Sequence, residues 1–584
     1  MILRHTISLR DAVLFMLGAS LMHLVYIFFS PTPNETSFII SNYVHQEADT
    51  EPLPPPIDTF PLKKPVIPPD TPSEHVVELS PSKEIAAHLA PELPLTSIVH
   101  SAPGYTIFRN LYMSNGTLFI HSPNRSFPEI RMMISVSIPA EATRENMEAR
   151  EPTPELMQFI TPEEAQRRWG GDVANNVRNS VFTVEGNTAL FNDPSQFLRH
   201  YYHFVAELFF GLQAFWHGAF STPIESIIPD PNKNSNLGGK NWNAYPNDPQ
   251  THHKSLYQLH NPAPPPIHRS IFMHADARGW RDDPGFNSYF LRAAFPAMSV
   301  EHQEDWNDRV AATTHSSRDR AWLFPLVILV DRSAAFREDM TGGHTQRTAA
   351  QAWEYMRNLG RLRGERVGGF WEPLRDAVLR FAGAGDVLAE YRAMEMLLGG
   401  TEDNHADFSI EDGALDAPLE LPMPSKVVVT YISRQGGSRR KLTPDSHESL
   451  VTALEELANR KDFELNVMKA ETLTKDEQLQ VIGRTTILLG VHGNGLTHLL
   501  FMPPTRVSAV IEIFYPGGFA HDYHWTSRAL GMPHFAVWND TYHTHPNEPT
   551  VDYPEGFQED YIPVHGPTVA KIIEDRLDGK IGKM

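Results

Sequence analysis

The sequence predicts an α/β protein whose C-terminal half contains a parallel, doubly wound sheet. Apolar runs of strand length alternate there with amphipathic stretches of helix length, which is the pattern of such sheets. Two of the helices have start signals, a Thr443-Pro444 pair and a capping box from Thr474 to Glu477. The length of 584 residues, 41% of them hydrophobic, allows roughly two to four domains.

The individual elements follow from the same periodicities. In the C-terminal half, strands are expected at residues 426–434, 463–469, 487–491, 508–515 and 534–539. Helices are expected there from residues 444, 475 and 496, and over 523–530 and 568–577. In the N-terminal half, strands are expected at 117–122, 132–140, 270–276 and 325–332, and helices after Ser195, over 346–360 and over 373–398.

The first residues predict a membrane anchor. Residues 12–29 are eighteen mostly apolar residues, which as a helix measure about 27 Å, close to the hydrocarbon thickness of a bilayer. The alternative is a cleaved signal peptide, whose apolar region is usually shorter. Because Arg4 and Arg10 precede the segment, residues 1–11 are expected in the cytosol and the rest in the lumen, as in a single-pass type II protein.

Composition divides the remainder of the chain. Residues 30–95 are rich in proline and are expected to form an extended stem. A second proline-rich stretch at about 221–268 reads as a disordered insertion. An N-terminal domain is then expected over residues 96–400 and a C-terminal domain over 401–584.

Charge and cysteine content exclude several classes of function. The 50 basic and 71 acidic residues give a net charge of −21, which is unsuited to binding nucleic acid. An anionic ligand must therefore meet a local basic cluster. The chain has no cysteine, so disulfides, thiolate catalysis and cysteine-ligated zinc are excluded.

One such basic cluster follows the first C-terminal strand. The sequence SRQGGSRR places Ser433, Arg434, Arg439 and Arg440 where doubly wound sheets bind ligands, beyond the carboxyl ends of their strands. Guanidinium groups bind phosphate oxygens in a bidentate manner, so the cluster predicts a diphosphate site. A solvated basic loop is the alternative interpretation.

A glycine-rich turn follows the third strand of the same half. Glycine at 493 and 495 allows a ligand to approach the backbone, and the helix expected from Leu496 has N–H groups that attract anions. His492 and Asn494 complete the turn, with His492 as a donor to a phosphate or ribose oxygen. In the next strand Glu512 is either a ribose-hydroxyl acceptor or a paired core carboxylate.

A fourth candidate lies far upstream, in RHYYHFVAELFFGLQAFW. His203 and Glu207 are four residues apart and share one face of a buried helix. A carboxylate that holds one imidazole nitrogen raises the basicity of the other, which is how a general base is made. A buried structural pair is the alternative.

Together these residues resemble glycosyltransferase family 61, and the resemblance covers residues 180–584 except the insertion. The features shared with the family are an H-x-x-x-[DE] helix at His203–Glu207, an arginine-rich strand end at 433–440, an HGAGLTN-LLF-P element at 492–504 and the acid-bearing strand of Glu512. Asn494 replaces the family's usual small residue, and His498 replaces its usual asparagine.

The resemblance implies a GT-B-like architecture, two Rossmann-like domains facing across a cleft, and inverting transfer from a UDP-sugar to a glycan or glycoprotein hydroxyl. It also implies a Golgi or endoplasmic reticulum membrane protein. His203 and Glu207 are the expected catalytic pair, and either one is a candidate for the base. No metal or other cofactor is expected, because the chain has no Asp-x-Asp triplet. The expected donor-binding residues are Ser433, Arg434, Arg439, His492, Gly493, Asn494, Gly495, Leu496 and Glu512.

The transferred sugar and the activity itself leave alternatives. Xylose is slightly favoured over N-acetylglucosamine, because the chain lacks the extra domains of animal N-acetylglucosaminyl members. The other class of function is an inactive lumenal binding or scaffold protein of the same fold. An ester hydrolase is excluded, because no G-x-S-x-G nucleophile motif is present.

Overall fold

A computed structural model describes residues 93–220, 264–314, 319–337, 348–362, 367–399 and 421–582, apart from residues 142, 173, 176, 438 and 560. The expected cytosolic tail, the anchor at 12–29, nearly all of the stem and the insertion up to 263 lie outside these residues. The expected domain boundary at 400 and 401 lies outside them too. No helix within the described ranges is long and apolar enough to span a bilayer.

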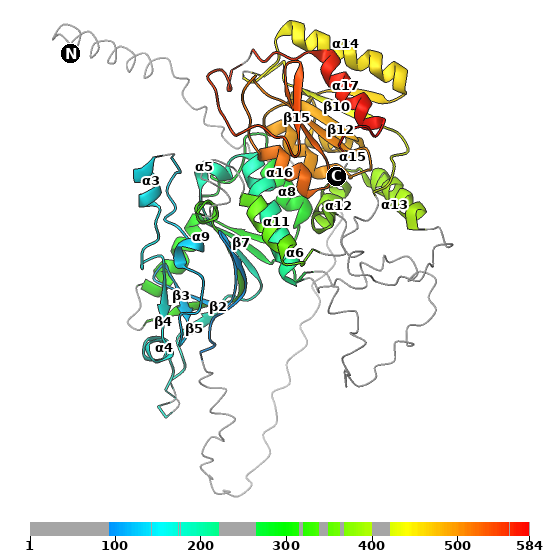
Figure 1. Ribbon diagram of the computed structural model, residues 1–584. Coiled ribbons are helices and arrows are strands. Elements are labelled where there is room, and N and C mark those ends of the chain that lie inside the picture. The colour runs from blue at the N-terminus through cyan, green and yellow to red at the C-terminus, as the bar shows by residue number, and fades with distance from the viewer. Residues whose placement is uncertain are drawn as a thin grey trace, which may run out of the picture. The chain divides into compact units, whose positions relative to one another are not determined.

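Nine strands of the N-terminal half form one sheet (Figure 1). The order along the sheet is β4-β3-β2-β9-β6-β7-β8, with β1 paired to β2 and β5 paired to β9. The strands are β1 Ser97–Ala102, β2 Tyr105–Ser114, β3 Thr117–His121, β4 Met157–Ile160, β5 Val181–Thr183, β6 Thr188–Pro194, β7 Arg269–His274, β8 Ser299–Glu301 and β9 Ala321–Val330.

This sheet is mixed, which corrects the expectation of a Rossmann-like N-terminal domain. Strand β2 runs antiparallel to β1, β3 and β9, while β6 runs parallel to β7 and β9. One of the antiparallel pairs has a local cause, because Asn115 and Gly116 have positive φ and close a two-residue hairpin between β2 and β3. The Asn-Gly pair was a hairpin signal that the sequence contained.

The strand expected at 132–140 is wrong. Only η1, Ile130–Met132, is regular there, and Met133 and Ile134 are buried in the core without pairing to a strand. Ser135 explains the difference, because its backbone N–H donates to the Asp331 carboxylate at 2.7 Å. A side chain therefore satisfies the backbone group that a neighbouring strand would otherwise have bound.

The C-terminal sheet has the predicted parallel form. Its order is β11-β10-β12-β13-β14-β15, parallel up to β14, with β15 antiparallel at the edge. Its strands are β10 Val428–Ser433, β11 Glu464–Lys469, β12 Ile487–Val491, β13 Ala509–Ile513, β14 His534–Trp538 and β15 Thr541–Thr544. The first strand, β10, lies between the second and the third, so the winding direction changes between β10 and β12.

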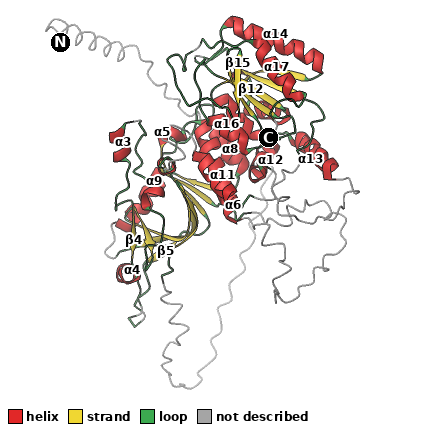
Figure 2. Cartoon of the chain, in the orientation of Figure 1, coloured by secondary structure: helices red, strands yellow, loops and turns green. Residues whose placement is uncertain are grey.

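Helices cover both faces of this sheet (Figure 2). α14 and α17 pack on one face, and α15, η8 and α16 pack on the other. Their bounds are α14 Pro444–Lys461, α15 Lys475–Arg484, η8 Asn494–Phe501, α16 Asp522–Ala529 and α17 Gly566–Leu577. Both predicted start signals are confirmed, since Thr443 caps α14 and Thr474 forms a capping box with Glu477 on α15. The helix expected from residue 496 is η8, which is a 3₁₀-helix.

Some helices of the N-terminal half pack on its mixed sheet, and others contact helices of the C-terminal half. The expected helix at 373–398 is two helices, because Gly383 between them has a φ of +82°. The remaining elements are α3 Arg144–Ala149, α4 Pro162–Trp169, α5 Ser195–Leu198, η2 Tyr202–Phe209, α6 Phe210–Phe220, α8 Phe286–Ala294, α9 Gln303–Thr314, α10 Arg332–Ala335, α11 Thr348–Asn358, η4 Gly369–Trp371, α12 Glu372–Phe381, α13 Gly385–Gly399 and η7 Ala470–Thr472.

One apolar core joins the two halves. It contains side chains of β6, β7 and β9, of η2 and α6, and of α15, η8 and α16. A hydrogen bond within it runs from Trp371 Nε1 to the Leu500 carbonyl at 2.9 Å. The core thus brings η2 of the N-terminal half against η8 of the C-terminal half.

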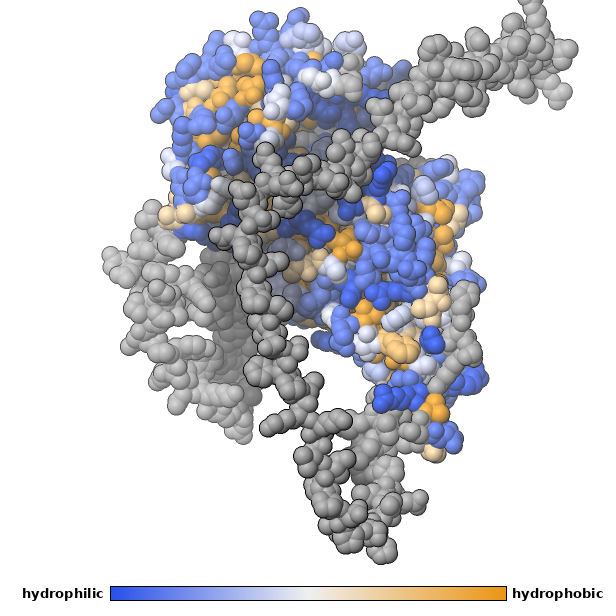
Figure 3. Space-filling model, turned by 180° about the vertical axis from the view of Figure 1, so that it is seen from behind, coloured by the Kyte–Doolittle hydropathy of each residue, from blue (hydrophilic) through white to orange (hydrophobic). Residues whose placement is uncertain are grey.

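The face of the molecule shown in Figure 3 is mostly hydrophilic, with apolar patches between the polar side chains.

We expect Tyr391→Phe to weaken the docking of α13 on the C-terminal half. The Tyr391 hydroxyl is buried and donates to the Pro504 carbonyl at 2.8 Å. Its loss should lower the free energy of unfolding by about 1 kcal/mol, measured by urea unfolding. Tyr561→Phe is the control, because Tyr561 is 68% exposed and the same change there should have no effect. Equal effects of the two variants would contradict this role of the Tyr391 hydroxyl.

Candidate functional site

The reversal point between β10 and β12 carries two arginines against a glycine. Arg434 follows β10, and Gly493 follows β12 after His492. Gly493 has a φ of +146°, and a Cβ placed there would overlap the Arg434 guanidinium and lie 3.6 Å from Arg440 Nη1. A side chain at position 493 would therefore strain the backbone and displace the Arg434 guanidinium from its present place.

Arg440, in place of the predicted Arg439, is the second arginine at this point. Arg440 has a φ of +50°, and its N–H donates to the Glu559 carbonyl at 2.9 Å. This turn leaves Arg439 exposed and directs Arg440 inward. Arg440 Nε is buried and has no hydrogen-bond partner among the described residues. The sequence shows both arginines, but it does not show the turn that decides which of them faces Gly493.

The two guanidinium groups raise each other's electrostatic energy. Burial lowers the pKa of Arg434, and the nearby charge of Arg440 lowers it further. Two like charges held together in a partly buried position are stabilised when an anion lies against both. The arrangement is therefore suited to a phosphate or diphosphate group.

His492 belongs to a buried network with Glu512 and His534. His492 Nδ1 lies 2.5 Å from Glu512 Oε1, and His534 Nε2 lies 2.7 Å from Glu512 Oε2. Burial raises the pKa of Glu512 well above its usual value and lowers those of His492 and His534 well below theirs. The network therefore favours neutral groups.

This network changes the role expected of Glu512. The carboxyl is completely buried, and an imidazole occupies each of its oxygens. Its contacts are those of a paired core carboxylate, which is one of the two interpretations that the sequence allowed, and they hold the ring of His492 in place. The other predicted residues differ in access: Asn494 is exposed, Gly495 is partly exposed, and Ser433 and Leu496 are buried.

The upstream pair meets on a π-helical segment. His203 and Glu207 lie on η2, and His203 Nδ1 is 2.5 Å from Glu207 Oε2. Arg332, the first residue of α10 after β9, forms an ion pair with the same carboxylate oxygen, and its Nη2 lies 3.2 Å from His203 Nδ1. π-helical turns are rare and frequently occur at functional sites.

Exposure separates the roles of His203 and Glu207. The His203 side chain is 17% exposed, whereas that of Glu207 is 1% exposed. Burial lowers the pKa of His203, and Glu207 opposes that effect without reversing it. Burial raises the pKa of Glu207, but Arg332 and His203 outweigh it, so this pKa is below its usual value. The result is a neutral imidazole held by a carboxylate, with His203 as the member that a ligand can reach.

Aromatic residues connect this pair to the glycine turn. The ring of Tyr202 lies 5.0 Å from that of Tyr523 on α16, and the Tyr523 ring lies 5.9 Å from that of His492. In parallel, the Tyr201 hydroxyl is 3.2 Å from His498 Nδ1, and His498 Nε2 is 3.0 Å from Gln478 Oε1. His498 thus has a structural place between the two halves.

Sequence reasoning missed Tyr523 as a part of this site. Arg332 directly follows the carboxyl end of a buried strand, so the sequence allowed it either to face the cleft or to form a structural ion pair. The structure shows an ion pair with Glu207, which lies 125 positions away in the chain. Tyr523 has no sequence signal, because its place depends on how α16 packs.

A parallel sheet in which cationic side chains gather at the change of winding direction is typical of nucleotide-binding α/β proteins. The family model described as Glycosyltransferase 61 matches residues 201–510, more than half of the chain. The protein therefore belongs to glycosyltransferase family 61. The matched range contains His203, Glu207, Arg434 and His492.

Individual relatives match a shorter part. An EGF domain-specific O-linked N-acetylglucosamine transferase of Drosophila melanogaster is 40% identical over 89 residues, 15% of this chain and 16% of the relative. The proteins of that name in Mus musculus and Bos taurus are 37% identical over 102 residues and 33% identical over 126 residues. The match covers 18% of the mouse protein and 22% of the bovine protein, and 17% and 21% of this chain.

We expect His498→Asn to reduce the dependence of stability on pH. Burial lowers the pKa of His498 to about 4. Because the unfolded value is near 6.5, the unfolded state takes up the proton first as the pH falls. The stabilisation is therefore complete above pH 6.5 and is lost toward pH 4, by up to about 3 kcal/mol.

Urea unfolding at several pH values between 7 and 4.5 measures this effect. The variant should lose less stability across the range than the natural chain, and the other buried histidines should retain part of the slope. His565→Asn is the control, since His565 is exposed. An unchanged slope in His498→Asn would show that His498 takes up its proton over the same pH range in the folded and the unfolded protein.

Proposed function

We propose that this protein is an inverting glycosyltransferase that moves a sugar from a UDP-sugar to a hydroxyl group of a glycan or glycoprotein. The observation that carries the proposal is the position of the Arg434 and Arg440 guanidinium groups against Gly493, where the sheet changes its winding direction. An anion is the group that this place accommodates best. The family membership defines the class of reaction.

The donor diphosphate lies against Arg434 and Arg440 in this proposal. Negative charge grows on the diphosphate as the bond to the sugar breaks, so fixed positive charges stabilise the transition state more than the bound donor. The N–H groups that follow Gly493 and the imidazole of His492 supply further donors. Glu512 and His534 hold that imidazole in place.

His203 is the proposed base. With its Nδ1 held by Glu207, its Nε2 accepts the proton of the acceptor hydroxyl while the hydroxyl oxygen bonds to the anomeric carbon. The bond from that carbon to the UDP oxygen breaks on the opposite face, so the configuration inverts. Glu207 is the weaker candidate, because Arg332 already holds its buried carboxylate.

No metal at the diphosphate is part of this proposal. The arginines carry the positive charge that a divalent cation supplies in other glycosyltransferases, and the chain has no Asp-x-Asp triplet to hold such a cation. A metal elsewhere in the protein is compatible with this scheme.

N-acetylglucosamine is the first donor sugar to test. The relatives in fly, mouse and cattle are named for O-linked N-acetylglucosamine transfer to EGF domains, although the match covers only 16–22% of them. Xylose, which the sequence slightly favoured, is the second. A type II arrangement in the Golgi or endoplasmic reticulum membrane is proposed on the apolar segment 12–29.

We expect UDP to raise the thermal midpoint of the natural chain and to do so much less in Arg434→Ala and Arg440→Ala. Each variant removes a charged hydrogen-bond donor, so the affinity for UDP should fall about tenfold or more. Arg460→Ala is the matched control, because Arg460 on α14 is 62% exposed. Calorimetric titration with UDP gives the affinities directly.

The outcomes separate the alternatives. If the natural chain shows no response to UDP, the inactive scaffold of the same fold is favoured. An equal response in Arg434→Ala and the natural chain would place the diphosphate elsewhere. If Arg439→Ala lost as much affinity for UDP as Arg440→Ala, Arg439 would also bind the donor, as the sequence predicted.

We expect His203→Ala to lower turnover by about 10²–10⁴-fold while UDP still raises the thermal midpoint. UDP release from UDP-N-acetylglucosamine and UDP-xylose, with a panel of glycoprotein acceptors, measures the turnover. His565→Ala, an exposed histidine, should keep full activity. Near-normal turnover in His203→Ala would exclude His203 as the base.

A further inference from the structure

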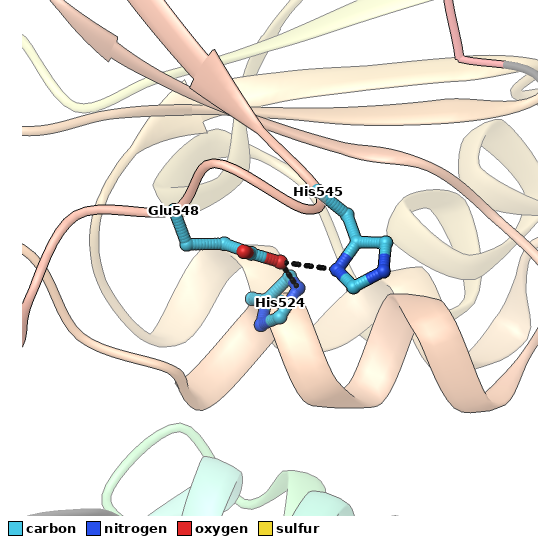
Figure 4. Close-up of side chains that lie close together, drawn as sticks. All are labelled: His524, His545 and Glu548. Carbon is cyan, nitrogen blue, oxygen red and sulfur yellow. Dashed lines mark hydrogen bonds and ion pairs between the residues drawn. The ribbon is translucent and has the colours of Figure 1, made fainter.

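A second group of ionisable side chains lies beside α16, outside the proposed donor and acceptor sites. It consists of His524 on α16, and His545 and Glu548 after β15 (Figure 4). Glu548 Oε1 lies 2.9 Å from His524 Nε2 and 2.7 Å from His545 Nδ1. In the close-up, the three side chains converge on one point from a helix and a loop.

The geometry fits a transition-metal ion. One ligand atom from each residue lies within 4.8 Å of the other two, which is the spacing of ligands around a common ion. Two imidazoles and one carboxylate are a ligand set that proteins use for Zn²⁺, with water in the fourth position. A small separation of these three ligand atoms would allow an ion to lie at about 2.0–2.2 Å from each of them.

The surroundings supply the support that metal-binding imidazoles usually have. His524 Nδ1, on the far side of the ring from Glu548, lies 3.1 Å from His521 Nδ1. A hydrogen bond to the second ring nitrogen fixes the orientation and tautomer of a metal-binding histidine. The cluster also has a route of entry, because the His524 side chain is 4% exposed while that of His545 is 56% exposed.

We propose that His524, His545 and Glu548 bind one divalent transition-metal ion of the Zn²⁺ class. The ion joins the loop after β15 to α16. The residue before His524 is Tyr523, whose ring contacts both Tyr202 and His492. The ion therefore stabilises the helix that packs between the two proposed substrate sites, and its role is structural.

The test uses the full chain after treatment with a chelator and removal of that chelator. Calorimetric titration with ZnCl₂ should show one high-affinity ion per chain, and Co²⁺ should give the visible absorption of a tetrahedral nitrogen and oxygen site. Zn²⁺ should also raise the thermal midpoint. His545→Ala and Glu548→Gln should each weaken the affinity at least tenfold, whereas His565→Ala should leave it unchanged.

His545 is exposed, so its replacement should not disturb folding. Without metal, His545→Ala should unfold at the same urea concentration as the natural chain, and any loss of Zn²⁺ affinity is then due to the missing ligand. The inference is overturned if the natural chain binds no Zn²⁺, or if His545→Ala and Glu548→Gln bind it as the natural chain does. In either case the cluster is a hydrogen-bonded group without a metal. The response to UDP is measured separately, so this outcome leaves the proposed transferase function intact.

Discussion

The buried ion pair between Glu207 and Arg332 is the contact on which the arrangement of the N-terminal half depends. It fixes η2 to the end of β9, a central strand of the mixed sheet, and both side chains are almost completely buried. Removing one partner leaves an unpaired charge away from water, at a cost of about 3–5 kcal/mol. The same contact holds His203, since the Glu207 carboxylate binds both residues. η2 then carries Tyr201 and Tyr202 to the C-terminal half, so one electrostatic contact positions the catalytic candidate and the interface together.

Two neighbouring parts of the fold have different electrostatic preferences. At the change of winding direction, two guanidinium groups lie together and favour an anion. Around His492, Glu512 and His534, burial favours neutral groups. A neutral imidazole beside a pair of fixed cations donates a hydrogen bond without adding a third positive charge. The site therefore gathers two positive charges within a chain whose net charge is −21.

Histidines give the region around α16 a continuous polar interior. The ring of His524 lies 5.5 Å from that of His534, which holds Glu512 and, through it, His492. The proposed metal cluster is therefore connected to the proposed donor site through packed rings, although the two share no residue. Movement of α16 affects Tyr523, and Tyr523 contacts both His492 and Tyr202. A structural ion at His524 thus has a physical route by which it supports the substrate sites.

The sequence by itself determined the parallel C-terminal sheet, its helix caps and the contact of His203 with Glu207, because periodicity, capping and i, i+4 spacing act over a few residues. It also placed an arginine cluster and a glycine turn at the ends of neighbouring strands. Only the tertiary structure decided that Arg440 faces Gly493 in place of Arg439, that Arg332 binds Glu207, and that Glu512 is enclosed by two imidazoles. Those contacts join segments that are far apart in the chain and that meet only through strand order and helix packing. The local sequence pattern does not determine that packing.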